Sequence, residues 1–418
     1  MHYFSYRNGL LFCEQVPLEE IAKELGTPLY VYSYRTLERH YEVFRDALKE
    51  LDHLICYSVK ANSNLAVIRT FAQKGAGADV VSGGELFRAL KAGVDPKRIV
   101  FSGVGKSPEE LRYALEVGVL MINVESGEEL RLLASLASEK GIRAPMSIRV
   151  NPDVDPLTHP YISTGLRSSK FGLEMKEAYE LFRWASRNSH LEVVGISCHI
   201  GSQITDLGPF LEAFGKIKEF FFTLKGAGID VRMVDLGGGL GITYRDEEPP
   251  HPSEYGKALA ELVKGMECTF VFEPGRVLVG NAGVLVTKVL YRKENGGKRF
   301  VVVDAAMNDL IRPTLYKAYH EILPCRLEER PKVKVDIVGP ICETGDYLAK
   351  DREIAEPMPG EFLAVMSAGA YGFSMSSNYN SRPRVAEVMV KDDKFWVVRK
   401  RESYEDLIRG EDIPEFLT

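Results

Sequence analysis

The sequence predicts an α/β protein with an added all-β part: a (β/α)8 barrel followed by a C-terminal β-sandwich or β-barrel domain that also receives the N-terminal strands. Two observations predict it. From about residue 50 to 275, short apolar, β-branched runs alternate eight times with amphipathic segments. From about residue 280, strand-like runs follow one another without helices between them. Eight units over roughly 250 residues fit a closed barrel better than an open doubly wound sheet.

The predicted barrel strands are short runs that begin 20 to 50 residues apart: 53–59, 76–81, 98–102, 120–124, 146–150, 193–199, 231–236 and 269–272. Apolar residues recur with helical spacing between them, which predicts helices over 63–74, 84–92, 107–116, 127–140, 176–187, 210–225 and 253–264. The widest gap lies between the fifth and sixth strands. Its dense turn residues, from Asn151 to Gly172, predict a long loop beyond the strand ends.

The all-β part is predicted from six runs: 283–291, 299–304, 333–338, 360–366, 383–390 and 395–399. At the other end of the chain, the runs 4–6 and 10–12 flank Asn8-Gly9, a favoured hairpin turn, and this hairpin could pair with the all-β domain. The predicted boundaries are therefore 1–30 for N-terminal strands joining the β domain, 31–278 for the barrel and 279–418 for the β domain.

Composition excludes several classes of protein. The chain is 45% hydrophobic and 27% charged, as in folded globular proteins. With 53 basic and 59 acidic residues it gives no support for a nucleic-acid-binding surface. We expect no membrane association and a cytoplasmic location, since there is no run of 18 apolar residues and no apolar core of a signal peptide. The six cysteines have no C-x-x-C spacing, so we expect neither a disulfide framework nor a metal site.

Polar residues stand at the predicted strand ends, where the chemistry of such barrels lies. They are Lys60, Asp79, Ser102, Glu125, Arg149, His199, Gly237-Gly238-Gly239 and Glu273. Any one of them alone is more often an ordinary surface or loop residue with satisfied hydrogen bonds. Their joint placement predicts an active site.

Lys60 ends the first barrel strand, where partial burial can free its amine for a covalent bond to an aldehyde. The glycines from Gly237 to Gly241 and the segment Glu273-Pro274-Gly275-Arg276 follow the last two strands, where barrels of this type bind phosphate. An aldehyde-binding lysine beside a phosphate site suggests pyridoxal phosphate, with Glu273 as partner of the ring nitrogen and His199 over the ring. The plainer readings are a surface lysine, tight turns and a hydrogen-bonded loop histidine.

Six motifs carry a family resemblance over nearly the whole chain. They are Tyr57-Ser-Val-Lys-Ala-Asn62, Cys198-His-Ile-Gly-Ser-Gln203, Asp235-Leu-Gly-Gly-Gly-Leu-Gly241, Glu273-Pro-Gly-Arg276, Gly339-Pro-Ile-Cys-Glu-Thr-Gly-Asp346 and Gly369-Ala-Tyr-Gly372. Together they resemble the alanine-racemase-like, fold-type III pyridoxal-phosphate-dependent decarboxylases. One departure is Val277, since the family more often has serine there, near the cofactor phosphate.

The resemblance implies a role for each matching residue. Lys60 would hold pyridoxal 5'-phosphate as an imine, His199 would stack on the ring and Glu273 would pair with its nitrogen, with Asp79 and Arg149 in support. The phosphate end would be lined by Ser202, Gly238, Gly239, Gly275, Arg276 and Tyr371. Arg276, Arg312 and Tyr316 would receive a distal carboxylate of the substrate, while Glu343 would receive a distal ammonium group and Tyr371 would also face the substrate. Cys342 would return a proton to Cα after carbon dioxide leaves.

Within the family, the segment from Arg312 to His320 and the loop Ser168-Ser169-Lys170-Phe171-Gly172 favour the members that convert meso-2,6-diaminopimelate to L-lysine, the last step of lysine biosynthesis. Such a substrate has two carboxylates and two ammonium groups, which calls for arginines and an acid together. The resemblance also implies a homodimer whose active sites take Cys342 and Glu343 from the partner chain.

Other readings stay open. One is a decarboxylase or racemase of the same fold acting on another amino acid, such as ornithine, arginine or carboxynorspermidine. Another is a non-catalytic pyridoxal-phosphate carrier, and a third is a class I aldolase that uses Lys60. The last two are disfavoured because neither needs the β domain, which carries Cys342, Glu343 and Tyr371.

Overall fold

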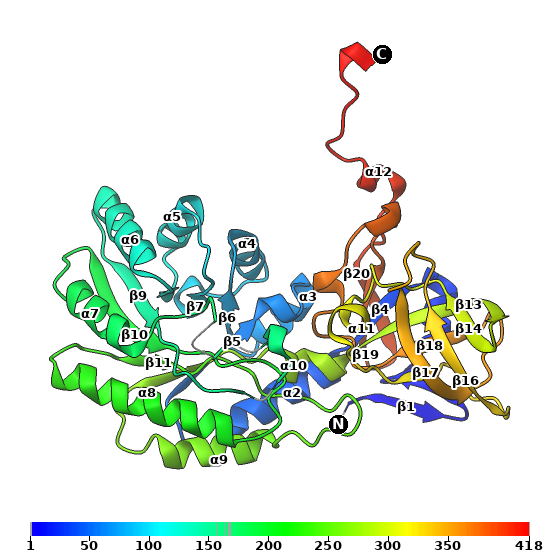
Figure 1. Ribbon diagram of the computed structural model, residues 1–418, viewed down its shortest axis with the longest axis horizontal. Coiled ribbons are helices and arrows are strands. Elements are labelled where there is room, and N and C mark those ends of the chain that lie inside the picture. The colour runs from blue at the N-terminus through cyan, green and yellow to red at the C-terminus, as the bar shows by residue number, and fades with distance from the viewer. Residues whose placement is uncertain (1, 157, 163, 166–168, 418) are drawn as a thin grey trace. The chain divides into compact units, whose positions relative to one another are not determined.

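The computed structural model describes residues 2–156, 158–162, 164–165 and 169–417. Ser168 of the predicted loop motif lies outside these residues. The chain divides into a barrel unit, Leu37–Val279, and a β unit made of Met1–Thr36 and Gly280–Thr418 (Figure 1). The barrel unit is therefore inserted, in sequence, between two parts of the β unit, which differs by a few residues from the boundaries predicted at 30/31 and 278/279.

The barrel unit contains a closed barrel of eight parallel strands, as the sequence predicts. They are β5 (His53–Ser58), β6 (Gly77–Val80), β7 (Ile99–Phe101), β8 (Met121–Val124), β9 (Ala144–Arg149), β10 (Leu191–Ser197), β11 (Met233–Asp235) and β12 (Thr269–Phe272). The barrel closes where β12 pairs with β5, with Phe272 opposite Ile55. The strands consist mainly of apolar residues because barrel and helices bury them on both sides. Closure brings Lys60, just after β5, near Glu273, just after β12.

Helices follow the strands around the barrel (Figure 1). They are α2 (Tyr34–Ala47), α3 (Leu65–Ala72), α4 (Gly83–Lys91), α5 (Pro108–Val117), α6 (Gly127–Lys140), α7 (Met175–Ala185), α8 (Gly208–Gly226), α9 (Pro252–Leu262) and α10 (Arg276–Val279). The sequence analysis did not predict α2. Serine N-caps at Ser82, Ser107 and Ser126 start three of these helices soon after a strand ends. The loops between strand and helix are therefore short and lie at the mouth of the barrel.

The β unit holds a nine-stranded sheet with the order β17-β16-β14-β13-β4-β19-β20, with β18 paired to β13 and β15 to β18. The strands are β4 (Leu29–Ser33), β13 (Gly283–Asn295), β14 (Lys298–Val303), β15 (Ile322–Pro324), β16 (Lys332–Val338), β17 (Tyr347–Ala355), β18 (Phe362–Val365), β19 (Ala386–Lys391) and β20 (Lys394–Arg399). β4, β15 and β17 were not predicted from the sequence. β4 lies at the centre of the sheet, because Val31 pairs with Val284 on one side and Val388 on the other.

The N-terminal segment forms the predicted hairpin. β1 (Phe4–Arg7) and β2 (Leu10–Cys13) are antiparallel, and β3 (Val16–Pro17) adds a third strand. The turn residues Asn8 and Gly9 have φ values of 49° and 77°, as a tight hairpin turn requires. Leu11 N–H donates to Cys325 O at 2.8 Å, which attaches the hairpin to the rest of the β unit.

The remaining helices of the β unit are short: α1 (Leu18–Leu25), α11 (Arg312–Tyr316) and α12 (Tyr404–Leu407). Short 3-10 turns occur at Val59–Ala61, Pro96–Arg98, Pro160–Ile162, Gly280–Ala282, Phe373–Met375, Tyr379–Ser381 and Glu415–Leu417. Across the described ranges, no helix is both long enough and apolar enough to cross a membrane.

Candidate active site

A cavity of about 430 Å³ opens at the C-terminal ends of the barrel strands. Its lining includes five of the strand-end residues that the sequence singled out, Lys60, Ser102, Arg149, His199 and Glu273. Phe171 and Asp235 line it as well. The cavity thus lies where the chemistry of barrel enzymes is found.

Lys60 stands in the 3-10 turn after β5, with a side chain about one-third exposed. Its Nζ donates to Asp79 Oδ2 at 2.6 Å, and Ser58 Oγ donates to the same oxygen at 2.8 Å. Asp79 is fully buried, and its Oδ1 has no hydrogen-bond partner within the described part of the chain. Asp79 therefore holds the amine of Lys60 at the cavity wall through a charge-assisted hydrogen bond.

Glu273 and Asp235 form the acidic floor of the cavity, at the ends of β12 and β11. Their carboxyl groups are hydrogen-bonded to each other, and Asn123 Nδ2 donates to Asp235 Oδ2 at 2.9 Å. Burial raises the pKa of Asp235 to about 6. Burial, reinforced by the negative charges of Asp235 and Asp79, raises the pKa of Glu273 well above its ordinary range. The two hydrogen-bonded carboxyl groups therefore both hold their protons to higher pH than ordinary carboxyl groups do.

Ser102 completes this floor. Its Oγ donates to Glu273 Oε1 at 3.4 Å and accepts from Asn123 Nδ2 at 3.0 Å. The floor is built from the ends of four strands, β7, β8, β11 and β12. Asn123 was not predicted, because it lies inside an ordinary apolar run and only the closed barrel turns it toward the two acids.

His199 follows β10 and lines the cavity. Its Nδ1 accepts from the backbone N–H of Gly238 at 3.2 Å, so the ring proton of the neutral imidazole sits on Nε2. Burial, aided by the positive charges of Arg149 and Lys60, lowers the pKa of His199 well below its ordinary value. The ring is therefore neutral and can pack against an aromatic ligand.

The glycine run after β11 passes very close to neighbouring strand ends. A Cβ on Gly238 would lie 2.2 Å from the carbonyl oxygen of Glu273. Gly239 has a φ of 113°, and a Cβ there would lie 2.6 Å from Gly201 O. Side chains are excluded at both positions, which leaves bare backbone suited to cradle a phosphate.

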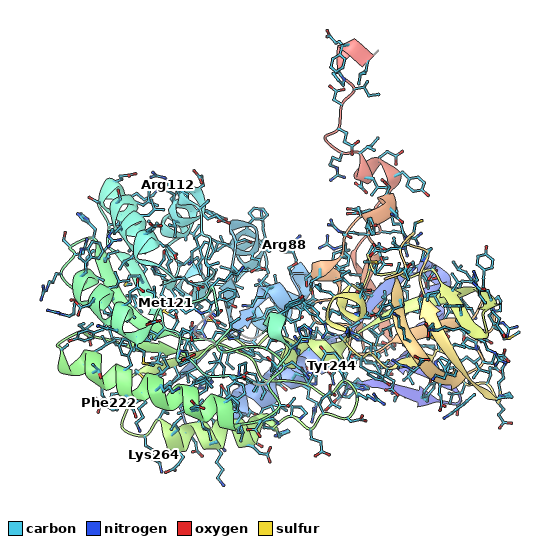
Figure 2. The ribbon with its side chains drawn as sticks, in the orientation of Figure 1. Arg88, Arg112, Met121, Phe222, Tyr244 and Lys264 are labelled. Atoms are coloured by element: carbon cyan, nitrogen blue, oxygen red, sulfur yellow. The ribbon has the colours of Figure 1, made fainter. Side chains whose placement is uncertain are left out.

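Arg276 begins α10 beside this run. Its Nη2 donates to Ser202 Oγ at 3.0 Å, and its Nη1 donates to Tyr244 Oη at 2.6 Å; Tyr244 is labelled in Figure 2. Gly275 packs against Ser58, since a Cβ on Gly275 would lie 3.1 Å from Ser58 Cβ. The structure thus gathers the predicted Ser202 and Arg276 and adds Tyr244, which carries no motif that could have identified it.

The other predicted residues belong to the β unit. Arg312 begins α11 and is 6% exposed, and its Nη1 donates to Nε2 of the fully buried His320 at 2.9 Å. His320 Nδ1 in turn donates to the backbone oxygen of Met366 at 2.8 Å. This chain fixes the tautomer of His320 and the orientation of the guanidinium. His320 was quoted only as part of the Arg312 segment, and its supporting role was not predicted.

Cys342 and Glu343 lie exposed in the loop before β17. Cys342 N–H donates to Asn380 Oδ1 at 2.9 Å, and Tyr379 is hydrogen-bonded to Glu343. Thr314 Oγ1 donates to Gly345 O at 2.6 Å, which ties this loop to α11, the helix of Arg312 and Tyr316. The β unit therefore brings the predicted substrate residues together on neighbouring segments.

Tyr371 is half-buried and adopts a φ of 55°, unusual for a tyrosine. It precedes Gly372, where a Cβ would lie 2.4 Å from Ala368 O. The predicted residues therefore fall into two groups, one in each unit.

Comparison with known proteins identifies the kind of chain. Residues 34–280 match the family model described as the pyridoxal binding domain of pyridoxal-dependent decarboxylases. Diaminopimelate decarboxylase of Pseudomonas aeruginosa is 54% identical over 413 residues, 99% of each chain, and that of Aquifex aeolicus is 51% identical over 407 residues, 97% and 96% of the two chains.

Solved structures of diaminopimelate decarboxylases have the same fold as this chain. The crystal structure of diaminopimelate decarboxylase from M. jannaschii superposes with a TM-score of 0.95 at 39% identity and covers 100% of this chain and 99% of that one. The Helicobacter pylori enzyme, complexed with L-lysine, gives a TM-score of 0.91 at 46% identity, over 94% and 98% of the two chains.

Proposed function

The chain belongs to the diaminopimelate decarboxylases, a family of pyridoxal-dependent decarboxylases, and we propose how its residues carry out the reaction. The protein is a carboxy-lyase that converts meso-2,6-diaminopimelate to L-lysine and carbon dioxide with pyridoxal 5'-phosphate as cofactor. The observation that carries the proposal is the cavity in which the Lys60 amine, held by Asp79, shares a wall with Glu273.

The barrel cavity fits the cofactor in two respects. Burial and the negative charges of Asp235 and Asp79 raise the pKa of Glu273, and a protonated pyridine nitrogen would give this buried carboxylate a cationic partner. The glycine run excludes side chains next to Arg276, as a phosphate requires. When bound, pyridoxal phosphate supplies an electron sink for the bond that breaks at Cα.

The barrel residues divide the work of holding this cofactor. Lys60 binds it covalently, and Asp79 and Arg149 position that end of the cavity. His199 packs its neutral ring on the cofactor, and Glu273 holds the ring-nitrogen proton. The phosphate end would be held by Ser202, Gly238, Gly239, Gly275 and Arg276 of the barrel unit, with Tyr371 supplied by a β unit.

The remaining residues select and orient the substrate. Arg276, Arg312 and Tyr316 bind the distal carboxylate, Glu343 binds the distal ammonium group, and Tyr371 contacts the substrate. Holding the distal end fixes the direction of the bond to the departing carboxylate, which is itself a contribution to catalysis. Cys342 returns a proton to Cα from its thiol. The test is release of carbon dioxide and lysine from meso-diaminopimelate, compared with ornithine and arginine; preference for ornithine would contradict the proposal.

Arg312→Ala is expected to lower kcat/KM for meso-diaminopimelate at least about tenfold, because a charge-assisted contact contributes about 1.5–3 kcal/mol. Cofactor binding on Lys60 should be unchanged. Steady-state kinetics and visible absorption measure the two effects. Tyr347→Phe is the control, since it removes a hydrogen bond to the same helix, from Tyr347 Oη to Pro313 O, without removing charge. Unchanged kinetics for Arg312→Ala would mean that the distal carboxylate is bound elsewhere.

A further part of the proposal is a twofold homodimer in which Cys342 and Glu343 of one chain complete the active site of the other. We also propose a cytoplasmic location. Two observations support the shared site: Cys342 is exposed, and it belongs to the β unit, whereas Lys60 belongs to the barrel unit. Mixing Lys60→Ala protein with Cys342→Ala protein is then expected to restore about a quarter of wild-type activity, since half of randomly formed dimers are mixed and each has one intact site of two. No recovery after verified subunit exchange would place both residues in the site of one chain.

A further inference from the structure

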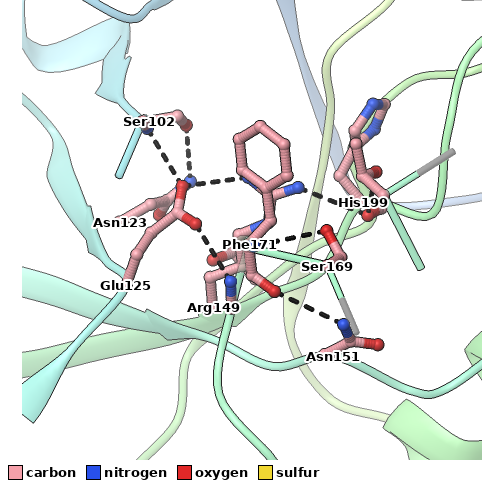
Figure 3. Close-up of polar contacts among 12 residues, drawn as sticks. Ser102, Asn123, Glu125, Arg149, Asn151, Ser169, Phe171 and His199 are labelled. Carbon is pink, nitrogen blue, oxygen red and sulfur yellow. Dashed lines mark hydrogen bonds and ion pairs between the residues drawn. The ribbon is translucent and has the colours of Figure 1, made fainter. Parts of the chain in front are cut away.

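Glu125 directly follows β8, and its carboxylate contacts three segments of the chain (Figure 3). Its side chain is 1% exposed. Oε1 accepts from Arg149 Nη1 at 2.9 Å and from the backbone N–H of Gly103 at 3.1 Å, while Oε2 accepts from the backbone N–H of Gly172 at 3.0 Å. The segment after β7, the end of β9 and the end of the long loop that starts at residue 151 therefore meet at Glu125.

The loop end is also attached at its base. Leu173 N–H donates to Arg149 O at 2.9 Å, Asn151 N–H donates to Leu173 O at 2.8 Å, and Asn151 Nδ2 donates to Phe171 O at 3.3 Å. Gly172 has a φ of 70°, and a Cβ there would lie 3.2 Å from Arg149 O. This turn directs the Gly172 amide to Glu125.

Two residues held in this way form part of the cavity wall. The guanidinium carbon of Arg149 lies 4.7 Å from the centre of the Phe171 ring, and both residues line the cavity together with Lys60 and His199. The guanidinium is thus placed by the carboxylate on one side and by the aromatic ring on the other.

The backbone of Glu125 is fixed as well. Its N–H donates to Glu129 Oε2 at 2.9 Å, and Glu129 Oε1 pairs with Lys106 Nζ at 2.6 Å. The Lys106 side chain is fully buried and also donates to Asn123 O at 2.7 Å. A carboxylate with a fixed backbone and three donors has little freedom, which suits a group that sets the position of others.

We propose that Glu125 is a positioning residue that holds Arg149 and the loop end Ser169–Gly172 in place, so that Phe171 forms a wall of the cofactor and substrate cavity. This rests on the proposed function only in taking that cavity as the reaction site. Glu125→Gln is the sharpest test. The amide keeps the size of the side chain but replaces one carboxylate oxygen by an NH2 group. If the NH2 group takes the place of Oε2, it faces the Gly172 N–H, and if it takes the place of Oε1, it faces Arg149 Nη1 and the Gly103 N–H, so in either orientation a donor faces a donor and the negative charge is lost.

Hydrogen exchange on the cofactor-free protein tests the attachment itself. Peptides covering 169–174 are expected to exchange at least about tenfold faster in Glu125→Gln than in wild type, the change that corresponds to losing one charge-assisted hydrogen bond. Glu139→Gln is the matched control, because Glu139 lies near the C-terminal end of α6 and, among the described residues, forms an exposed ion pair with Arg112 at 2.7 Å. Unchanged exchange in Glu125→Gln would overturn the proposal.

Kinetics on the holoenzyme test the consequence. In Glu125→Gln we expect KM for meso-diaminopimelate to rise about tenfold with a smaller change in kcat, and Glu125→Asp, which keeps the charge, to lie between this variant and wild type. In a Phe171→Ala background the effect of Glu125→Gln on KM should largely disappear, since Glu125 acts through Phe171.

Additive effects of Glu125→Gln and Phe171→Ala, or a KM unchanged despite faster exchange, would overturn the positioning role. If Glu125→Gln does not fold, the same measurements on Glu125→Asp decide, since partial loss of protection and a raised KM are still required. Failure of the wild-type protein to bind pyridoxal phosphate on Lys60 would defeat the proposed function, whereas the exchange result would still decide whether Glu125 fixes the loop end.

Discussion

Lys60→Ala is expected to reduce lysine formation from meso-diaminopimelate by at least about 10²-fold, because the covalent attachment that orients the cofactor in the cavity is lost. The alanine cannot bond to the cofactor aldehyde and leaves Asp79, whose Oδ2 now accepts from Lys60 Nζ, without its cation. The variant should still bind pyridoxal phosphate, but only non-covalently.

Borohydride reduction followed by peptide mapping measures this directly. In wild type the pyridoxyl group should be found on the peptide that contains Lys60, and in Lys60→Ala no lysine should carry it. Lys74→Ala is a suitable control, because Lys74 forms surface ion pairs with Glu38 and Glu42 on the barrel exterior and should leave labelling and activity unchanged. A pyridoxyl group on a different lysine of the wild type would sink the assignment.

Glu273→Gln is expected to lower kcat about 10²-fold while the cofactor stays attached to Lys60, a loss like that caused by removing one fixed group that stabilises developing charge. An amide cannot stabilise a protonated ring nitrogen as a carboxylate does. Single-turnover kinetics with meso-diaminopimelate and the visible spectrum separate the two effects. Asn123→Ser is a useful comparison variant, because it removes the hydrogen bond from the Asn123 amide to Asp235 but keeps the carboxylate of Glu273. Wild-type rates in Glu273→Gln would remove the proposed role.

The same variant has an effect on stability in the cofactor-free protein. The folded-state pKa values of Asp235 and Glu273 are both raised, so their contribution to the free energy of unfolding is fully present below the ordinary carboxyl range and is lost as the pH rises. For Asp235 this loss runs from about pH 4 to about 6, and for Glu273 it continues higher. Thermal unfolding of cofactor-free Glu273→Gln should therefore depend less on pH across and above this window than that of wild type.

The sequence was sufficient to predict the barrel, because each strand is a continuous apolar run that is buried on both faces, and the polar strand ends pointed to Lys60, His199 and Glu273. It was not sufficient for β4, whose sequence Leu29-Tyr-Val-Tyr-Ser33 has ordinary strand composition but whose partners β13 and β19 lie far along the chain. His320 and Asn380 were missed as supporting residues for a similar reason. The supporting role of His320 depends on its contact with Arg312, and that of Asn380 on its contact with the backbone of Cys342. Such contacts cannot be predicted from the sequence of a single protein.

Because β4 lies between β13 and β19 in the sheet, it is synthesised long before both of its partner strands. β4 leaves the ribosome before the barrel, whereas β13 and β19 leave after it, because the whole of Leu37–Val279 stands between them. At about 5–20 residues per second, the barrel takes on the order of ten to fifty seconds to synthesise. Throughout that time the Leu-Tyr-Val-Tyr run is an unpaired, apolar strand that can join another chain. The nascent protein therefore carries an aggregation-prone segment until β13 emerges and pairs with one edge of β4, and the barrel has time to fold first.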